Sequence, residues 1–283
     1  MKMAKTKKKI NLIISYIFLI ILGIIMIYPL LWMFSASFKT NNEIFSSLSL
    51  IPKQIVSGGY FAGWKGSGQY SFDLYFLNTF IMVIPTVLFT IISSLLVAYG
   101  FARFKFRFKK PLFALVIASL MLPTEVVIIP RYMLFNSLNW LNSYLPFIVP
   151  AAFATYSFFI FMLVQYIRSI PRELDESAFI DGCSSFAILT KIIVPLCKPA
   201  LISVGIFQFV WRWNDFLNPL IYISSVRKYP LSLALRMTLD VTDTISWNQV
   251  MAMSVLSLVP PVLLFFFTQK YFVEGIATSG LKG

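Results

Sequence analysis

Long stretches of hydrophobic residues without any charge dominate the pattern along this chain. One stretch runs from Ile10 to Phe38 and another from Leu74 to Ala102. Apolar runs of 18 or more residues are typical of membrane-spanning helices, whereas the apolar region of a secretory signal peptide has only about 7–15 residues. The pattern therefore predicts six spans, at about residues 12–34, 77–101, 111–129, 145–167, 199–223 and 249–269.

Basic residues indicate how these spans are oriented. Sixteen of the 24 Lys and Arg residues lie at the N-terminus, after the second and fourth spans, and after the sixth. Cytoplasmic segments of membrane proteins carry an excess of Lys and Arg. We therefore expect both termini to be cytoplasmic. The same short basic clusters explain the net charge of +13 without a nucleic-acid partner.

The remaining composition is consistent with a membrane protein. The chain is 58% hydrophobic and only 12% charged, and residues 41–73 contain five glycines, which predicts an irregular outer loop. We expect an all-α integral membrane protein in three parts. These parts are a first helix with the outer loop over residues 1–74, a membrane core over 75–270, and a cytoplasmic tail over 271–283.

Metal chemistry has few candidate ligands in this chain. There are two cysteines, Cys183 and Cys197, and no histidine. So small a set argues against a zinc or haem site, and two thiols on a cytoplasmic loop are expected to be free. We expect no metal site and no catalytic residue.

The segment Pro171–Pro199 is unusual because it places four of the eleven acidic residues between hydrophobic runs. Pro171 suits the first position of a helix, where its missing N–H is no loss. The acidic residues that follow favour the positive end of the helix dipole. Gly182 predicts a left-handed stop to this first helix.

A second short helix is expected after that stop. Ser184 or Ser185 can cap it, and it should end at Ile193, before Pro195. The prediction is a hairpin of two short helices that projects into the cytoplasm. A solvated loop with ordinary caps is the alternative that these residue types leave open.

Motif spacing in this hairpin has a counterpart in a known family. Glu176-Ser177-Ala178, two residues, Asp181-Gly182 and then Ile193-Val194-Pro195 resemble the EAA loop of ABC-importer permeases. Ser177 replaces the usual alanine and Val194 precedes the proline, both conservative in size. Outside the hairpin, Trp213-Asn214-Asp215-Phe216 and the last 13 residues resemble the carbohydrate branch, in particular the maltose-type subunit with a short Lys-Gly tail.

The resemblance implies a type I ABC importer permease fold, with six transmembrane helices and cytoplasmic coupling helices. In that family the hairpin sits in a cleft of an ATPase subunit, and closure of two ATPases moves paired hairpins. The residues assigned to coupling are Glu176, Ser177, Ala178, Asp181, Gly182 and Pro195. The implied partners are a second homologous permease subunit, two ATP-binding subunits and an extracytoplasmic solute-binding protein, in a bacterial inner membrane.

ATP hydrolysis is not expected in this chain. A P-loop requires the spacing GxxxxGK[ST], and the nearest candidate, Gly58 to Lys65, has the wrong spacing and lies outside. We expect no cofactor in this chain, and ATP with Mg to be used by the partner. The resemblance implies that the tail, with Ser279, Gly280 and Lys282, reaches between the ATPases; a frayed end is the alternative.

Charged and amide side chains within the spans are candidates for a translocation path, because an ionisable group in a membrane is costly. Arg212 and Asp215 are three residues apart and can pair on one helix face. The candidate path residues are Glu125, Arg212, Asn214, Asp215 and Asn218. An interfacial aromatic belt or helix packing would use the same residue types, and in the maltose system the main sugar site lies in the companion permease.

Three functions are consistent with these observations. The first is a sugar-class ABC importer permease, and the second is an ABC permease for another solute such as glycerol phosphate. The third is a secondary transporter, which leaves the hairpin of residues 171–199 unexplained. The sequence does not name the solute.

Overall fold

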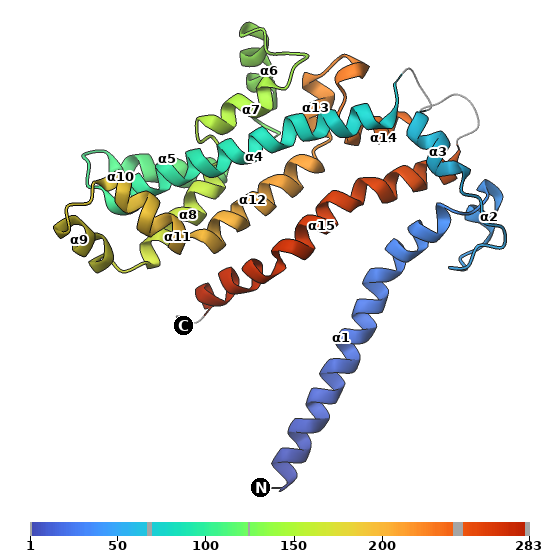
Figure 1. Cartoon of the computed structure of the whole chain (residues 1–283), viewed down its shortest axis with the longest axis horizontal. Coiled ribbons are helices and arrows are strands. Elements are labelled where there is room, and N and C mark those ends of the chain that lie inside the picture. Colours follow the sequence, from blue (N-terminus) through green and yellow to red (C-terminus); the bar gives the residue numbers. More distant parts are fainter. Residues whose placement is uncertain (1, 67–69, 124, 240–245, 281–283) are drawn as a thin grey trace. The chain divides into compact units, whose positions relative to one another are not determined.

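A computed structural model describes residues 2–66, 70–123, 125–239 and 246–280, with side chains except at 2–8, 10 and 271–280. The described residues form helices, turns and loops without a strand (Figure 1). The chain divides into two compact units, one of residues 1–72 and 235–258 and the other of residues 73–234 and 259–283. Each unit is described separately.

The first unit contains the N-terminal helix and the loop that follows it. Its helices are α1 (Lys2–Ala36), α2 (Asn41–Ser46), α3 (Gly58–Lys65) and the first part of α15 (Trp247–Gly280). The apolar stretch Asn11–Ala36 of α1 has exposed hydrophobic side chains on all sides. A helix that is hydrophobic all round is typical of a membrane span, because lipid covers every face.

Residues 41–73 are more regular than the sequence predicted. The glycine-rich part was expected to be an irregular loop, yet it contains α3, and Thr40 caps α2 by accepting a hydrogen bond from the N–H of Glu43. Lys39 is fully buried, and its ammonium donates to the carbonyl oxygens of Ser47 and Ser49. The backbone of this loop therefore satisfies a buried charge, which holds the loop in one conformation.

The second unit holds most of the helices. They are α4 (Phe72–Arg103), α5 (Lys109–Leu120), α6 (Ile128–Ser137), α7 (Leu145–Ala152), α8 (Ser157–Ser169), α9 (Glu173–Ile180), α10 (Ser185–Ile188), a π-helical segment (Leu189–Ile193), α11 (Val194–Leu196), α12 (Lys198–Trp213), α13 (Leu217–Tyr222), a 3₁₀ turn (Val226–Lys228) and α14 (Leu231–Met237).

The core of the second unit lies between α4, α8 and α12 (Figure 1). Three threonines inside α4 are satisfied locally, since the hydroxyls of Thr79, Thr86 and Thr90 each donate to the carbonyl four residues earlier. Ser93 has a local contact to the carbonyl of Thr90 at 3.4 Å and a shorter bond, at 2.6 Å, to the carbonyl of Ala151 at the end of α7. Back-bonding of this kind lets a helix carry hydroxyls through an apolar environment.

Four described helical stretches are long and apolar enough to cross a membrane: Asn11–Ala36, Phe72–Arg103, Leu145–Ser169 and Trp247–Lys270. A fifth span results if Ser185–Leu196 and Lys198–Trp213, which meet at 76°, are counted together. These stretches match the first, second, fourth and sixth predicted spans. The expected class, an all-helical membrane protein, is therefore confirmed.

Two predicted spans differ from the structure. The helix predicted over 111–129 is shorter than expected, because α5 ends at Leu120. Pro123 has no N–H to continue the helix and disfavours helical geometry at Leu122. The helix predicted over 199–223 ends at Trp213, and a short separate helix, α13, follows it.

Candidate functional site

The hairpin of residues 171–199 begins with α9, which ends in a compact turn at Gly182. The Gly182 N–H donates to the carbonyl of Phe179 at 3.1 Å, and the Cys183 N–H donates to the carbonyl of Ala178 at 2.9 Å. Gly182 has φ +81°, so these two bonds form a Schellman motif with glycine in the left-handed position. The predicted glycine stop is confirmed.

The second half of the hairpin is partly as predicted. Ser184 caps α10 by accepting a hydrogen bond from the N–H of Ala187. The helix does not stop before Pro195, however, and continues through it to Leu196. A π-helical turn precedes the proline. In this turn the Val194 N–H donates to the carbonyl of Leu189, five residues earlier, where an α-helix would bond the residue four positions earlier. Pro171 also lies outside the first helix, which begins at Glu173.

Four side-chain interactions fasten the hairpin and the residue just before it to the end of α4, and we call this set the clamp. Arg103 forms an ion pair with Asp175, with Nε and Oδ2 2.5 Å apart, and its Nη2 donates to the carbonyl of Ile170 at 3.1 Å. In the reverse direction, Arg172 donates to the carbonyl of Ala102 at 3.1 Å. The fourth interaction is a hydrogen bond at 3.1 Å from the hydroxyl of Tyr99 in α4 to the carbonyl of Ser185.

Asp175 is held in the clamp at an electrostatic cost. Burial raises the pKa of its carboxyl, while the Arg103 and Arg172 guanidiniums oppose that rise. Its second oxygen, Oδ1, is buried and has no hydrogen-bond partner within the described residues. This agrees with a pKa that burial raises. The ion pair with Arg103 is therefore what compensates the buried carboxylate.

Apolar packing reinforces the clamp. Ala178 of α9 and Ile188 of α10 belong to the same buried cluster as Leu95 and Ala98 of α4 and Leu163 of α8. A force applied to the hairpin therefore acts on a packed body that includes two candidate spans.

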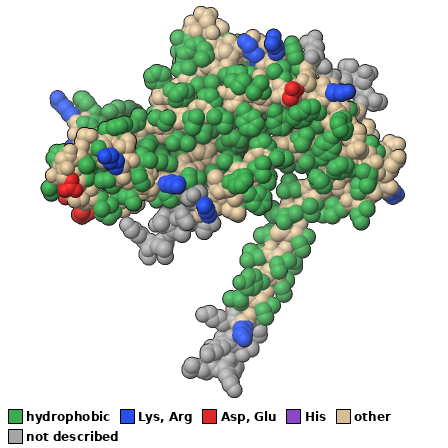
Figure 2. Space-filling model, viewed as in Figure 1, with side chains coloured by type: hydrophobic (Ala, Val, Ile, Leu, Met, Phe, Trp, Pro, Cys, Tyr) green, Lys and Arg blue, Asp and Glu red, His purple; other side chains and the backbone are tan. Residues whose placement is uncertain are grey.

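The residues expected to couple to an ATPase lie on different sides of the hairpin. Glu176, Ser177, Asp181, Gly182 and Pro195 are exposed. Ala178 faces the chain's own core and is only 7% exposed. Figure 2 shows acidic side chains gathered over α9. The outward surface is thus carried by Ser177 and its exposed neighbours, while Ala178 packs inward.

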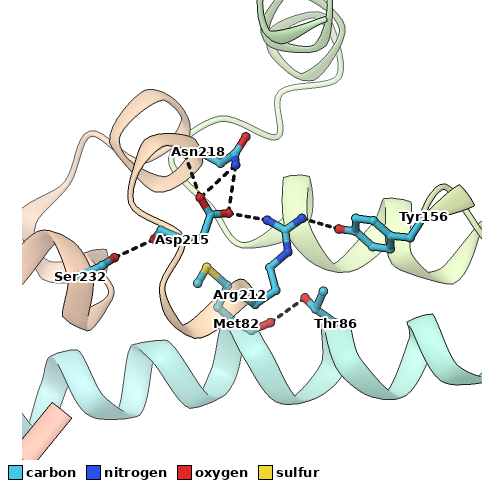
Figure 3. Close-up of polar contacts among 7 residues, drawn as sticks. All are labelled: Met82, Thr86, Tyr156, Arg212, Asp215, Asn218 and Ser232. Atoms are coloured by element: carbon cyan, nitrogen blue, oxygen red, sulfur yellow. Dashed lines mark hydrogen bonds and ion pairs between the residues drawn. The ribbon is translucent and has the colours of Figure 1, made fainter. Parts of the chain in front are cut away.

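The charged pair predicted within the fifth span exists, but it does not lie on one helix face. Arg212 is in the last turn of α12, and Asp215 follows the end of that helix. Their Nη1 and Oδ2 atoms are 2.5 Å apart (Figure 3). Asp215 also accepts from the backbone N–H and side-chain amide of Asn218, which lies in the first turn of α13.

Other elements join this polar cluster. The Tyr156 hydroxyl, just before α8, accepts a hydrogen bond from Arg212 Nη2 at 2.7 Å, and Ser232 of α14 donates to the carbonyl of Asp215 at 2.8 Å (Figure 3). The Arg212 guanidinium also lies 5.7 Å from the ring centre of Phe147. The cluster therefore ties the end of α12 to α7, α8, α13 and α14.

The two remaining candidates for a translocation path lie outside this cluster. Asn214 donates to the carbonyl of Val210, and Glu125 is exposed in the turn after α5 and not inside a helix. An opening of about 370 Å³ is lined by Trp211, Arg212, Asn214, Asp215 and Asn218, together with Val210. Four of the five candidates thus share one opening, and Glu125 does not line it.

The residues expected to form the ATPase-contacting tail lie at or beyond the end of the described chain. Ser279 and Gly280 lie at the end of α15, with undescribed side chains, and Lys282 lies outside the described residues. No group of three or more His, Cys, Asp or Glu side chains that could hold a metal occurs in the described part of the chain.

Sequence reasoning missed the clamp as a unit. It noted Arg103 and Arg172 only as basic residues that set orientation, and Asp175 only as a partner of the helix dipole. Opposite charges at the end of a span and in the next cytoplasmic segment were the available signal. Tyr99 and Tyr156 gave no signal at all, since a tyrosine in an apolar run is usually a packing residue.

The proteins that this chain resembles are membrane components of transport systems. Residues 91–278 match the family model described as "Binding-protein-dependent transport system inner membrane component". The arabinooligosaccharides transport system permease protein AraQ of Halalkalibacterium halodurans is 32% identical over 283 residues, covering 98% of this chain and 100% of that protein. The sn-glycerol-3-phosphate transport system permease protein UgpE of Yersinia pestis is also 32% identical, covering 94% of this chain and 96% of that protein.

A solved structure shows the same fold. A chain of a bacterial ABC transporter involved in the import of the acidic polysaccharide alginate superposes with a TM-score of 0.82. The match covers 93% of this chain and 97% of that chain, at 22% sequence identity.

Proposed function

The chain belongs to the family of binding-protein-dependent transport system inner membrane components, and we propose that it receives the movement of a partner ATPase through the hairpin of residues 171–199. It is a multi-pass inner-membrane permease subunit of an ABC importer. It is not an enzyme, and ATP is used by a partner in the complex. Family membership excludes the secondary transporter considered above.

The clamp is the observation that carries this proposal. Mechanical coupling requires that a displaced hairpin moves the spans and does not bend away from them. Arg103, Asp175 and Arg172 join the hairpin to the end of α4, and Ala178 and Ile188 pack into the core of the same unit. A displacement of the hairpin then becomes a displacement of α4 and α8 together.

Exposed apolar side chains on the hairpin support a protein partner. Phe179, Ile180 and Phe186 are 69%, 84% and 69% exposed, although the hairpin is expected in the cytoplasm. Burying each of them on docking would contribute about 1.5–3 kcal/mol. Glu176 and Ser177 are exposed on the same helix as Phe179 and Ile180, so the hairpin offers both apolar and polar groups, as protein interfaces usually do.

The wider assembly follows from the family. We propose six spans with cytoplasmic termini, pairing with a second homologous permease, two ATP-binding subunits and an extracytoplasmic solute-binding protein. In this arrangement the paired hairpins are drawn together when the ATPases close, and the path changes from inward- to outward-facing. The opening beside Asn214, Asp215 and Asn218 is proposed to belong to that path.

A sugar or oligosaccharide is the proposed solute. AraQ is named for arabinooligosaccharides and the structural match for alginate, so both are carbohydrate systems. The aromatic and amide residues around Arg212 suit a sugar, because rings stack on its apolar faces and amides bond its hydroxyls. The second candidate is glycerol phosphate, which is supported by the match to UgpE at the same identity.

Purification of the tagged chain from its own membranes tests the assembly. We expect a separate ATP-binding subunit to accompany it, and reconstituted vesicles to take up solute only when ATP and the binding protein are both present. Uptake that proceeds without the ATPase would contradict the proposal. A panel of labelled oligosaccharides, monosaccharides and glycerol 3-phosphate in the same vesicles then separates the two solute classes.

A further inference from the structure

A second cavity lies in the second unit next to the polar cluster. It measures about 200 Å³, and residues from α6, α7, α12 and α13 line it, together with Tyr156. Its aromatic walls include Phe135, Phe147 and Tyr222, whose rings pack edge to face with centre distances of 5.3 and 5.9 Å from Tyr222. Phe135 and Phe147 are buried, so these walls are held in place by the surrounding packing.

One polar group in this wall has no partner. The hydroxyl of Tyr222 is buried, and among the described residues it makes no hydrogen bond. Most buried polar atoms in proteins are hydrogen-bonded, and an exception calls for a water, an ion or a ligand. Tyr222 is one of the residues that line the cavity, so a molecule held there is a candidate partner for its hydroxyl.

The charge of the lining favours an anion. Arg131 and Arg212 both line the cavity, and none of the lining residues is acidic. Arg212 is neutralised by Asp215, whereas Arg131 is exposed and forms no ion pair within the described residues. One cationic charge is therefore left for an occupant, and a guanidinium binds the oxygens of carboxylate or phosphate well.

The remaining features favour a small polyol. Asn218 uses its amide nitrogen on Asp215, and its amide oxygen points away from that carboxylate in Figure 3, so it can accept from a hydroxyl. Pockets for drug-sized ligands have volumes of about 300–1,000 Å³. The smaller volume of this cavity suits one sugar unit and excludes an oligosaccharide.

We propose that this cavity binds one hydroxyl-rich anionic unit, a sugar acid or a sugar phosphate. Arg131 pairs with the anionic group, the Tyr222 hydroxyl bonds an oxygen of the ligand, and the rings of Phe135 and Phe147 face its carbon skeleton. This proposal deepens the proposed function by naming a solute class. Only the role of the bound unit in transport rests on the proposed function. Binding itself is independent of the ATPase.

The test measures binding to the full-length chain in lipid nanodiscs by titration calorimetry. The probes are D-glucuronate and glucose 6-phosphate, with neutral glucose and inorganic phosphate as comparisons. The first variant, Arg131→Gln, removes the free charge, and Arg227→Gln is its control, being an exposed arginine that does not line the cavity. The second variant, Tyr222→Phe, removes only the hydroxyl, and Tyr132→Phe in α6 is its control.

We expect at least one of the two sugar anions to bind at least tenfold more tightly than glucose or inorganic phosphate. Arg131→Gln should lose about tenfold in affinity and Tyr222→Phe about threefold to tenfold, while both controls bind as the parent chain does. Which anion binds more tightly distinguishes a carboxylate from a phosphate ligand. Absence of binding for both anions, or equal losses in the controls, would overturn the inference. ATP-driven uptake and its dependence on the hairpin would be unaffected by that failure.

Discussion

Replacing Asp175 by asparagine isolates the ion pair on which the clamp depends. The change keeps the size of the side chain but removes the charge that pairs with Arg103. Their side chains are 18% and 6% exposed, so the pair is largely shielded from water. Exposed ion pairs contribute at most about 1 kcal/mol and breaking a fully buried pair costs about 3–5 kcal/mol, so for this largely shielded pair we expect a loss of about 2 kcal/mol.

That loss has a measurable local consequence. Since 1.4 kcal/mol corresponds to a factor of ten, the open state of the hairpin should be about 30-fold more populated. Amide hydrogens of α9 should then exchange about 30-fold faster, while those in the middle of α4 keep their rate. In the reconstituted complex we expect Asp175→Asn to hydrolyse ATP but to import less solute for each ATP consumed.

Glu173→Gln provides the matched control. Glu173 is an acidic residue of the same helix, but it is exposed and has no part in the clamp. We expect its exchange rates and its transport per ATP to equal those of the parent chain. If Asp175→Asn leaves both quantities unchanged, or if Glu173→Gln changes them equally, the clamp does not transmit the movement.

Three further outcomes follow from the same contacts. Gly182→Val places a branched side chain at a positive φ, which strains the turn by about 1–2 kcal/mol or more. We expect normal membrane insertion but uptake that is uncoupled from ATP hydrolysis, and normal uptake would disprove the role of this turn. Phe179→Ala should weaken copurification of the ATPase by about tenfold or more, whereas Phe108→Ala, another exposed phenylalanine in an inner segment, should leave it unchanged. Asp215→Asn leaves the largely shielded guanidinium of Arg212 without its carboxylate and should destabilise the chain by about 2 kcal/mol or more in thermal unfolding. Adding Arg212→Gln should recover part of that loss, and no recovery would show that the pair is not the cause.

Much of the fold could be predicted from local chemistry. Apolar length alone located four spans, because a helix must satisfy its own backbone hydrogen bonds in lipid. The Schellman turn at Gly182 and the cap at Ser184 were also accessible, since both depend on residues within one turn of the chain. The early end of the third predicted helix could not be predicted from the sequence. Whether a helix continues past a proline such as Pro123 depends on tertiary packing.

The site was less predictable than the fold. Arg212 and Asp215 were identified as a pair, but on a continuous helix, whereas Asp215 lies in the short connection between α12 and α13. The clamp joins residues about 70 positions apart in the chain, and nothing in one sequence fixes which arginine meets which carboxylate. Ala178 illustrates the same limit, because a small residue in a motif suits either an outer docking face or an inner core, and here it packs inward.

Cross-linking at the hairpin tests the central claim most directly. In a full-length chain with Cys183 and Cys197 changed to alanine, a single Ser177→Cys probe would be placed on the exposed face of α9, and Ser57→Cys on the expected outer loop. In membranes that contain the assembled importer, we expect the probe at position 177 to cross-link to the ATPase subunit, with a yield that changes when ATP is bound, and the probe at position 57 not to cross-link to it. Cross-linking of the ATPase from position 57, or its absence at 177 in an actively transporting complex, would contradict the account.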